Sequence, residues 1–173
     1  RHPDRSTDPR ARADGAVNPT DVAWAIGRIY IGWPVRLITR ARAVGIENVP
    51  KTGGVVYAIN HLHWIGIPLI GLLSPRTGWF VAKAEAANYP VAGGFLRLHG
   101  AIAIRRGESD REAVRRMREE ARAGHVVGLF VEGTRQRSGR PGVAQPGAAM
   151  VGLQEDVPII PVAIYGTQFW KPG

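Results

Sequence analysis

Val55-Val56-Tyr57-Ala58-Ile59-Asn60-His61 is an uninterrupted apolar run that ends in an amide and an imidazole. Continuous apolar residues, several of them β-branched, predict a strand that is buried on both faces of a sheet. His61 then enters a turn at the end of this strand. A histidine in that place suits proton transfer near neutral pH, although a single histidine after a strand can equally be structural.

Similar apolar runs recur along the chain and alternate with helical patterns. Four further strands are predicted, at 79–82, 101–104, 126–131 and 159–164. Helices are expected at 109–124 and at 147–154. The order of these elements predicts a single α/β domain over residues 45–173, with a central β-sheet flanked by helices.

The clearest helix lies between the predicted strands at 101–104 and 126–131. Ser109 and Glu112 form a capping box, and Gly124 is a good C-terminal stop. Its apolar stripe comprises Ala113, Val114, Met117 and Ala121. The remaining side chains are mostly charged, and they indicate a solvated face more than a nucleic-acid-binding patch.

The composition limits the classes of function. The chain has 173 residues, 45% of them hydrophobic, which suits one domain with a sizeable core. Its net charge of +9 favours anionic partners such as a phospholipid surface, a phosphorylated metabolite or nucleic acid. Because there is no cysteine, there is no disulfide, thiolate metal site or cysteine nucleophile, and we expect no metal.

The N-terminal region has two parts. Residues 1–19 have little to bury and predict a disordered basic arm. Residues 20–44 are rich in aliphatic and aromatic side chains, contain Pro34, and carry Arg36, Arg40 and Arg42 near their end. They predict a kinked amphipathic helical segment that associates with a membrane, without a continuous apolar span of about 20 residues. The alternative is a helix that only covers the core.

A second strand end carries a dense group of polar residues. The run 126–131 is followed by Glu132-Gly133-Thr134-Arg135. Polar groups at the end of a buried strand are costly unless they are paired, and binding sites commonly lie at such ends. Arg135 and Thr134 can hold a phosphate while Gly133 lets the backbone approach it. The competing interpretation is a surface turn with an incidental Glu–Arg pair.

Two further segments complete the pattern. Gly100 precedes a strand that ends in Arg105 and Arg106, and alternation predicts that only one of these arginines faces a shared site. The run 157–163 is rich in proline and has no reactive side chain, so we expect it to shape a pocket.

These four segments, in this order and at these spacings, resemble the motifs of the glycerolipid acyltransferase family, which includes bacterial lysophosphatidic acid acyltransferases. The first motif is Asn-His, four residues and an aspartate; Asn60 and His61 match it, and Gly66 stands in place of the aspartate. The second is a glycine, an apolar strand and an arginine, and it matches Gly100 and Arg106.

The third motif, Phe-Pro-Glu-Gly-Thr-Arg, matches residues 130–135, with Val131 in place of the proline. The fourth, an apolar run with a central proline, corresponds to the segment around Pro161. Lys83 resembles a lysine that often follows the family's next strand. The family usually continues well beyond its fourth motif, so we expect the chain to be truncated at its C-terminus.

The resemblance implies direct acyl transfer in phospholipid biosynthesis. His61 would deprotonate the free hydroxyl of a lysophospholipid such as 1-acylglycerol-3-phosphate, which attacks the thioester of acyl-CoA or acyl carrier protein. No cofactor is implied, and the enzyme would be peripheral or monotopic at the cytoplasmic face of the membrane. The glycerol phosphate would be bound by Arg106, Glu132, Gly133, Thr134, Arg135 and Lys83, with Asn60, Gly100 and Pro161 shaping the pocket.

Gly66 is the departure from the family pattern. The missing aspartate would orient the imidazole, as in a serine-protease triad, where neutralising the carboxylate costs about 10⁴ in turnover. Three explanations stay open: an engineered or accidental change in an otherwise complete enzyme, a catalytically inactive membrane-associated relative that binds lipid, or a site that uses Glu132 or water to orient His61. Nucleic-acid binding is disfavoured because no nucleic-acid-binding motif is present.

Overall fold

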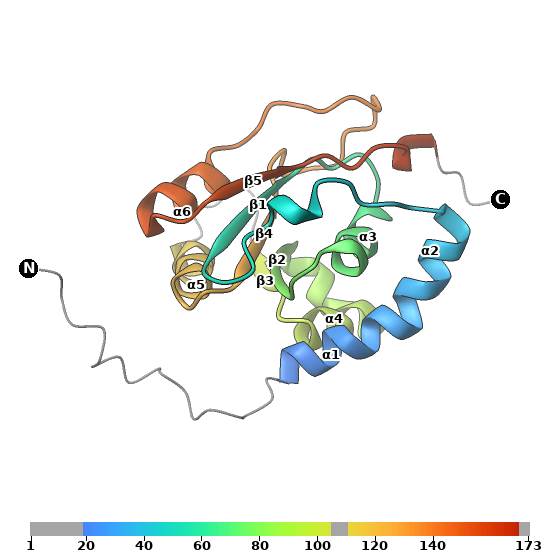
Figure 1. Cartoon of the computed structure of the whole chain (residues 1–173), viewed down its shortest axis with the longest axis horizontal. Helices are drawn as coiled ribbons and strands as arrows, with labels where there is room; N and C mark the ends of the chain where they lie inside the picture. The colour runs from blue at the N-terminus through green and yellow to red at the C-terminus, as the bar shows by residue number, and fades with distance from the viewer. Residues whose placement is uncertain (1–18, 105–110, 170–173) are drawn as a thin grey trace, which may run out of the picture.

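Five parallel strands, in the order β3-β2-β4-β1-β5, form the central sheet of the computed structural model, which describes residues 19–104 and 111–169 (Figure 1). The strands are β1 (Val55–Ile59), β2 (Gly78–Lys83), β3 (Ile102–Ile104), β4 (Val126–Phe130) and β5 (Ile159–Val162). β1 pairs with β4 and β5, and β2 pairs with β3 and β4. Because all these pairs are parallel, the carboxyl ends of the strands share one edge of the sheet, called the C-terminal edge below.

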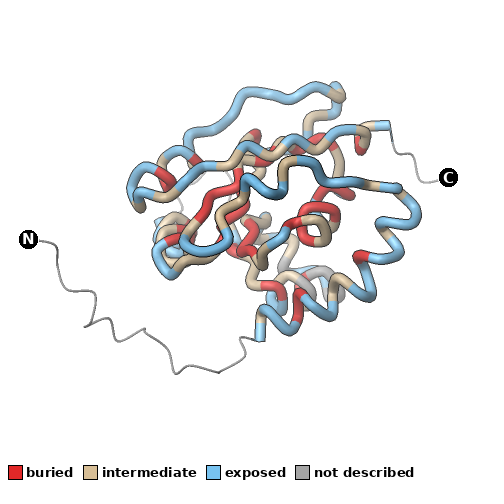
Figure 2. Tube along the Cα trace, viewed as in Figure 1, coloured by how far each residue is buried: buried red, intermediate tan, exposed pale blue. Residues whose placement is uncertain are grey.

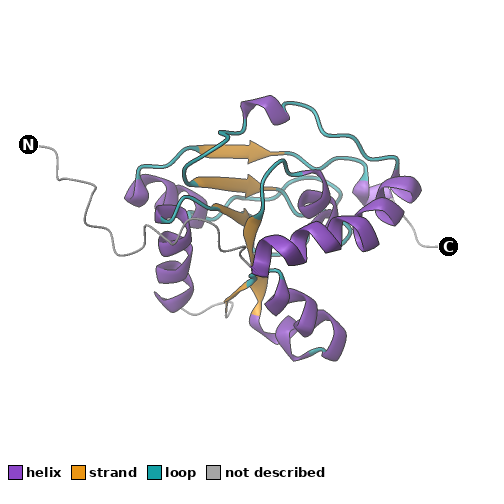
Figure 3. Ribbon diagram, turned by 60° about the horizontal axis from the view of Figure 1, so that its bottom comes forward, coloured by secondary structure: helices purple, strands orange, loops and turns teal. Residues whose placement is uncertain are grey.

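Helices cover both faces of the sheet (Figures 1 and 3). The connections contain α3 (Gly66–Leu73), the 3₁₀ turn η4 (Ala84–Asn88) with α4 (Pro90–Leu98), α5 (Arg111–Arg122) and α6 (Gly147–Glu155), in chain order. From β1 to β3 the chain moves toward one side of the sheet, and after β3 it returns to the other side. The connecting helices switch from one face of the sheet to the other at this reversal, because right-handed crossovers in opposite directions place their helices on opposite faces.

The alternation of β1 divides the core into two layers. The buried residues concentrate on the sheet and the helices packed against it (Figure 2). Val56 packs with residues of α5 and α6, such as Met117 and Val151. Val55 and Tyr57 point to the other face, where they join a cluster with residues of α1 and α3. The side chains of these five residues, three from β1 and two from the helices, are almost completely buried. Both faces of β1 are therefore covered, as its apolar run predicts.

The N-terminal segment consists of α1 (Pro19–Gly27), a π-helical turn η2 (Arg28–Gly32) and α2 (Trp33–Thr39). The irregular turn of this segment is η2, which ends before Pro34, and Pro34 lies in the first turn of α2, where a proline is tolerated. Arg28 ties the segment to the domain, since its guanidinium donates to the carbonyl oxygens of Gly71 (3.4 Å) and Ser74 (3.0 Å) at the end of α3. In the part of the chain that the structure describes, no helix has the length and apolarity needed to span a membrane.

Several predictions from the sequence need correction. The helices α3 and α4 were not expected, and β3, β4 and β5 are shorter than predicted. β5 lies at the edge of the sheet with Ile159 exposed, and a proline such as Pro161 is tolerated at an edge strand. Pro19, expected in the arm, begins α1. The rest of the arm, the cap residue Ser109 and both Arg105 and Arg106 lie outside the described residues.

Candidate active site

His61 and the turn that follows β4 meet at the C-terminal edge. β1 and β4 are neighbours with Ile59 opposite Phe130, so the residues that leave these strands lie side by side. The backbone N–H of His61 donates to Glu132 Oε2 (3.0 Å), and the N–H of Gln136 donates to the carbonyl oxygen of His61 (2.8 Å). The two polar strand ends are thus joined by hydrogen bonds on both sides of His61.

Glu132 is a buried carboxylate that holds backbone segments in place. Its side chain is only 6% exposed, and its second oxygen accepts a bond from the N–H of Gly142 (3.2 Å). A buried carboxylate is stable where backbone N–H groups satisfy its oxygens. Glu132 therefore positions His61 through the backbone, and its predicted roles in binding substrate or orienting the imidazole stay predictions.

The imidazole of His61 packs on an aromatic ring. The ring centroids of His61 and Phe130 are 4.2 Å apart, with an angle of 34° between the planes. His61 is 8% exposed. This packing restricts the rotation of the imidazole, which a general base requires for a fixed approach to its proton.

Asn60 joins β1 to the chain that leaves β5. Its Oδ1 accepts a bond from the N–H of Ile164 (2.6 Å), and its Nδ2 donates to the carbonyl oxygen of Ile164 (3.0 Å). The side chain thus extends the pairing of β1 and β5 beyond the end of the strands. Pro161 faces Ala58 in this pair, and it lines a cavity of about 380 Å³ together with apolar residues of α3 and Ile164. Asn60 does not line this cavity, and the prediction that Asn60 and Pro161 shape a substrate pocket stays a prediction.

Gly66 is the first residue of α3, and it is buried. The first turn of α3 contains no acidic residue. A Cβ placed on Gly66 would lie 3.2 Å from Cδ1 of Ile164, the tip of a flexible side chain. Because the backbone there is helical, a side chain is compatible with this position after a shift of a few tenths of an ångström at Ile164.

The other residues predicted for the site differ in their surroundings. Gly133 has a φ of +66°, which favours glycine, and both Thr134 and Arg135 are exposed beside it. Lys83, at the end of β2, forms an ion pair with Glu85 (3.0 Å). Gly100 precedes β3 and packs against Trp79, so its predicted part in shaping the pocket stays a prediction. Arg106 lies outside the described residues.

Comparison with known proteins identifies the family. A family model described as Acyltransferase matches residues 40–165, which include His61 and the turn after β4. This chain belongs to the acyltransferase family.

Two relatives within the family carry the names of lysolipid acyltransferases. The chain is 32% identical over 127 residues to a lyso-ornithine lipid O-acyltransferase of Pseudomonas aeruginosa, covering 72% of this chain and 47% of that protein. It is 30% identical over 130 residues to a 1-acyl-sn-glycerol-3-phosphate acyltransferase of Borreliella burgdorferi, covering 71% and 50%. The chain thus spans about half the length of these curated relatives.

A solved acyltransferase shares the fold. The crystal structure of the 1-acyl-sn-glycerophosphate acyltransferase PlsC from Thermotoga maritima matches with a TM-score of 0.68 and 28% identity. The match covers 86% of this chain and 58% of that structure. The single α/β domain with its flanking helices is therefore an acyltransferase fold.

Three residues at the site escaped the sequence reasoning. Gln136 and Gly142 hold His61 and Glu132 through backbone N–H groups, and Ile164 bonds Asn60 through its backbone. Backbone contacts depend little on side-chain type, so the sequence offered no signal for them. The burial of Glu132 is also a tertiary property, because its neighbours come from distant segments.

Proposed function

We propose that this chain transfers a fatty acyl group from a thioester, acyl-CoA or acyl carrier protein, to the free hydroxyl of a lysophospholipid such as 1-acylglycerol-3-phosphate, in phospholipid biosynthesis. The observation that carries the proposal is the junction of His61 with the turn Glu132 to Arg135 through the 3.0 Å bond at the C-terminal edge. Relatives named for two different lysolipid acceptors share this family, so the acyl transfer is the common chemistry.

In the proposed reaction, His61 acts as the general base. The imidazole removes the proton from the acceptor hydroxyl while the oxygen attacks the carbonyl carbon of the thioester. The tetrahedral intermediate then collapses, the carbon–sulfur bond breaks, and the departing thiolate takes the proton back from the imidazolium. Arg135 and Thr134, with Arg106, would hold the acceptor phosphate beside His61, which makes the attack effectively intramolecular.

Gly66 would impair this reaction. No carboxylate at position 66 can fix the tautomer of His61 or stabilise the imidazolium as the proton moves. The second candidate function, favoured by this one substitution, is a catalytically inactive, membrane-associated lipid-binding relative. Both candidates use the same acceptor site and differ only in turnover.

The N-terminal segment would place the site at a membrane surface, peripherally on the cytoplasmic face. Large apolar side chains of α1, η2 and α2 are exposed, namely Ile26, Ile29, Tyr30, Trp33, Leu37 and Ile38. Arginines follow at the end of α2, and such a basic and apolar combination favours anionic lipid. Trp33→Ser with Leu37→Ser should weaken binding to anionic vesicles, whereas Leu153→Ser, at an exposed position of α6, should not. Equal binding of all forms would contradict this placement.

The test of the activity uses labelled acyl-CoA and 1-acylglycerol-3-phosphate, with the diacyl product measured by mass spectrometry. His61→Gln is made both in the natural chain and together with Gly66→Asp. Removing the general base should lower turnover by about 10²–10⁴ in the Gly66→Asp background, and by less in the natural chain, where His61 already lacks its orienting carboxylate. Unchanged turnover of Gly66→Asp without the imidazole would reject the proposed mechanism. Acceptor binding without turnover in every form, Gly66→Asp included, would establish the inactive lipid-binding relative.

A further inference from the structure

The loop between β4 and α6 carries more positive charge than the acceptor needs. Arg135, Arg137 and Arg140 fall within six residues, and no Asp or Glu occurs from Gly133 to Gln154. All three arginines are exposed. Only Arg135 has a role in the proposed reaction, so the charges of Arg137 and Arg140 are unexplained.

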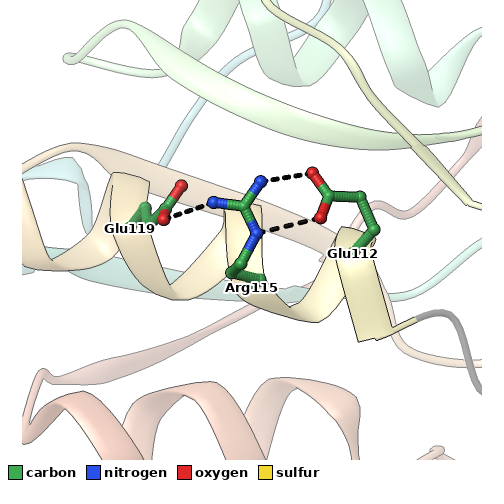
Figure 4. A network of polar contacts seen from close by, with 3 residues as sticks. All are labelled: Glu112, Arg115 and Glu119. Carbon is green, nitrogen blue, oxygen red and sulfur yellow. Dashed lines mark hydrogen bonds and ion pairs between the residues drawn. The ribbon is translucent and has the colours of Figure 1, made fainter.

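Three arginines of α5, at positions 115, 118 and 122, differ from these because glutamates neutralise them. There, Arg115 is bound by Glu112 and Glu119 on the same helix (Figure 4). Within the described ranges 19–104 and 111–169, neither Arg137 nor Arg140 takes part in an ion pair. Their guanidinium groups are therefore open to an anionic ligand.

The loop is also held in a defined shape beside His61. It is anchored at one end by the N–H of Gln136 on His61 and at the other by the N–H of Gly142 on Glu132. Between these anchors, Ser138 Oγ accepts a bond from the N–H of Arg140 (3.3 Å), and Gly139 makes the turn with a φ of +73°. Arg137 and Arg140 are therefore carried by one short turn, which begins directly after the residue that is anchored on His61.

We propose that Arg137 and Arg140 form a second anion site, which binds the phosphate groups of coenzyme A while Arg135 binds the acceptor. The inference rests on the proposed function and names its donor. Two anionic substrates must meet at one histidine, and each needs its own countercharge. Guanidinium groups bind phosphate oxygens bidentately, and two of them on one short turn match a compact nucleotide better than the extended charge of an acidic carrier protein.

The test measures donor binding independently of turnover. A non-hydrolysable thioether analogue of acyl-CoA is titrated by calorimetry into the chain and into the double variant Arg137→Gln/Arg140→Gln. Loss of charge-assisted hydrogen bonds should weaken binding of the analogue roughly tenfold or more. The control is Arg116→Gln, which replaces an exposed arginine of α5. This variant should bind the analogue as tightly as the natural chain does.

Two further titrations decide whether the two arginines bind the phosphates of coenzyme A or the phosphate of the acceptor. The analogue without the 3′-phosphate should bind the natural chain more weakly, and the double variant should not distinguish the two forms. Binding of 1-acylglycerol-3-phosphate should change less than twofold in the double variant.

Equal affinity of the analogue for the natural chain and the double variant would overturn the proposal, as would a lack of binding to the natural chain. A loss confined to acyl carrier protein would overturn it in favour of a carrier-protein site. Acyl transfer is assayed in parallel. If the analogue binds through Arg137 and Arg140 but no acyl transfer occurs, the proposed function is rejected and the donor site stands.

Discussion

Three substitutions at Gly66 test separately whether the size, the polarity or the charge of the missing side chain matters for turnover. Gly66→Ala adds only a Cβ, 3.2 Å from the tip of Ile164, which a small rotation relieves. Gly66→Asn adds a polar group of the same shape as aspartate, and Gly66→Asp adds the charge. Since α3 begins at this residue and its first turn has no acidic side chain, the aspartate also faces the positive end of the helix dipole.

The expected stability changes are modest and favourable. Replacing a helical glycine gains up to about 1 kcal/mol, part of which the contact with Ile164 offsets. The charge at the helix N-terminus adds about 0.3–1 kcal/mol for Gly66→Asp alone, and the burial of the carboxylate offsets part of this gain. For a chain of this size, a net gain of about 1 kcal/mol raises Tm by roughly 2–4 °C.

The expected change in turnover is much larger. A carboxylate that orients a catalytic histidine is worth up to about 10⁴ in turnover in serine proteases, so Gly66→Asp should raise acyl transfer by orders of magnitude. Gly66→Asn and Gly66→Ala should stay close to the natural chain, because neither stabilises an imidazolium.

The assay is initial-rate acyl transfer with labelled acyl-CoA, together with acceptor affinity by calorimetry, which should change little. Equal turnover of the natural chain and Gly66→Asp would refute the role of the missing carboxylate. A gain shared by Gly66→Ala would attribute the effect to packing against Ile164 instead of charge.

Three further substitutions test the scaffold. Asn60→Ala removes both bonds to the backbone of Ile164 and should lower the free energy of unfolding, measured in urea, by about 1–3 kcal/mol. Gly128→Ala places a Cβ 2.3 Å from the ring of Phe80 and should cost about 1–3 kcal/mol in the same assay; a neutral result would contradict the packing. Burial raises the pKa of Glu155, but bonds from two arginines of α5 outweigh it and hold the pKa below its ordinary value of 4.5. This stabilisation is present above that value and is lost as pH falls through the lower, folded-state pKa. Glu155→Gln should therefore lower Tm at pH 7, and the deficit should disappear as the pH falls below that pKa, whereas a deficit independent of pH would contradict the assignment.

The strands and the charged helix were predictable because their signals are local. An apolar run such as 55–59 can be stable only where both faces are covered, and the stripe of α5 has the helical period. The helices α3 and α4 were missed because α3 is apolar almost throughout and both contain helix-weakening glycines. Their formation depends on packing against the sheet and the N-terminal segment.

The sequence by itself determined the α/β class, the strands that end in polar residues and the two segments that carry the candidate chemistry. Each depends on a short window of residues. Only the tertiary structure decided that β4 inserts beside β1, which brings the Glu132 carboxylate to the N–H of His61, and that Asn60 binds Ile164 across 104 positions of sequence. Strand order and long-range hydrogen bonds depend on how distant segments pack, and local patterns carry no record of that packing.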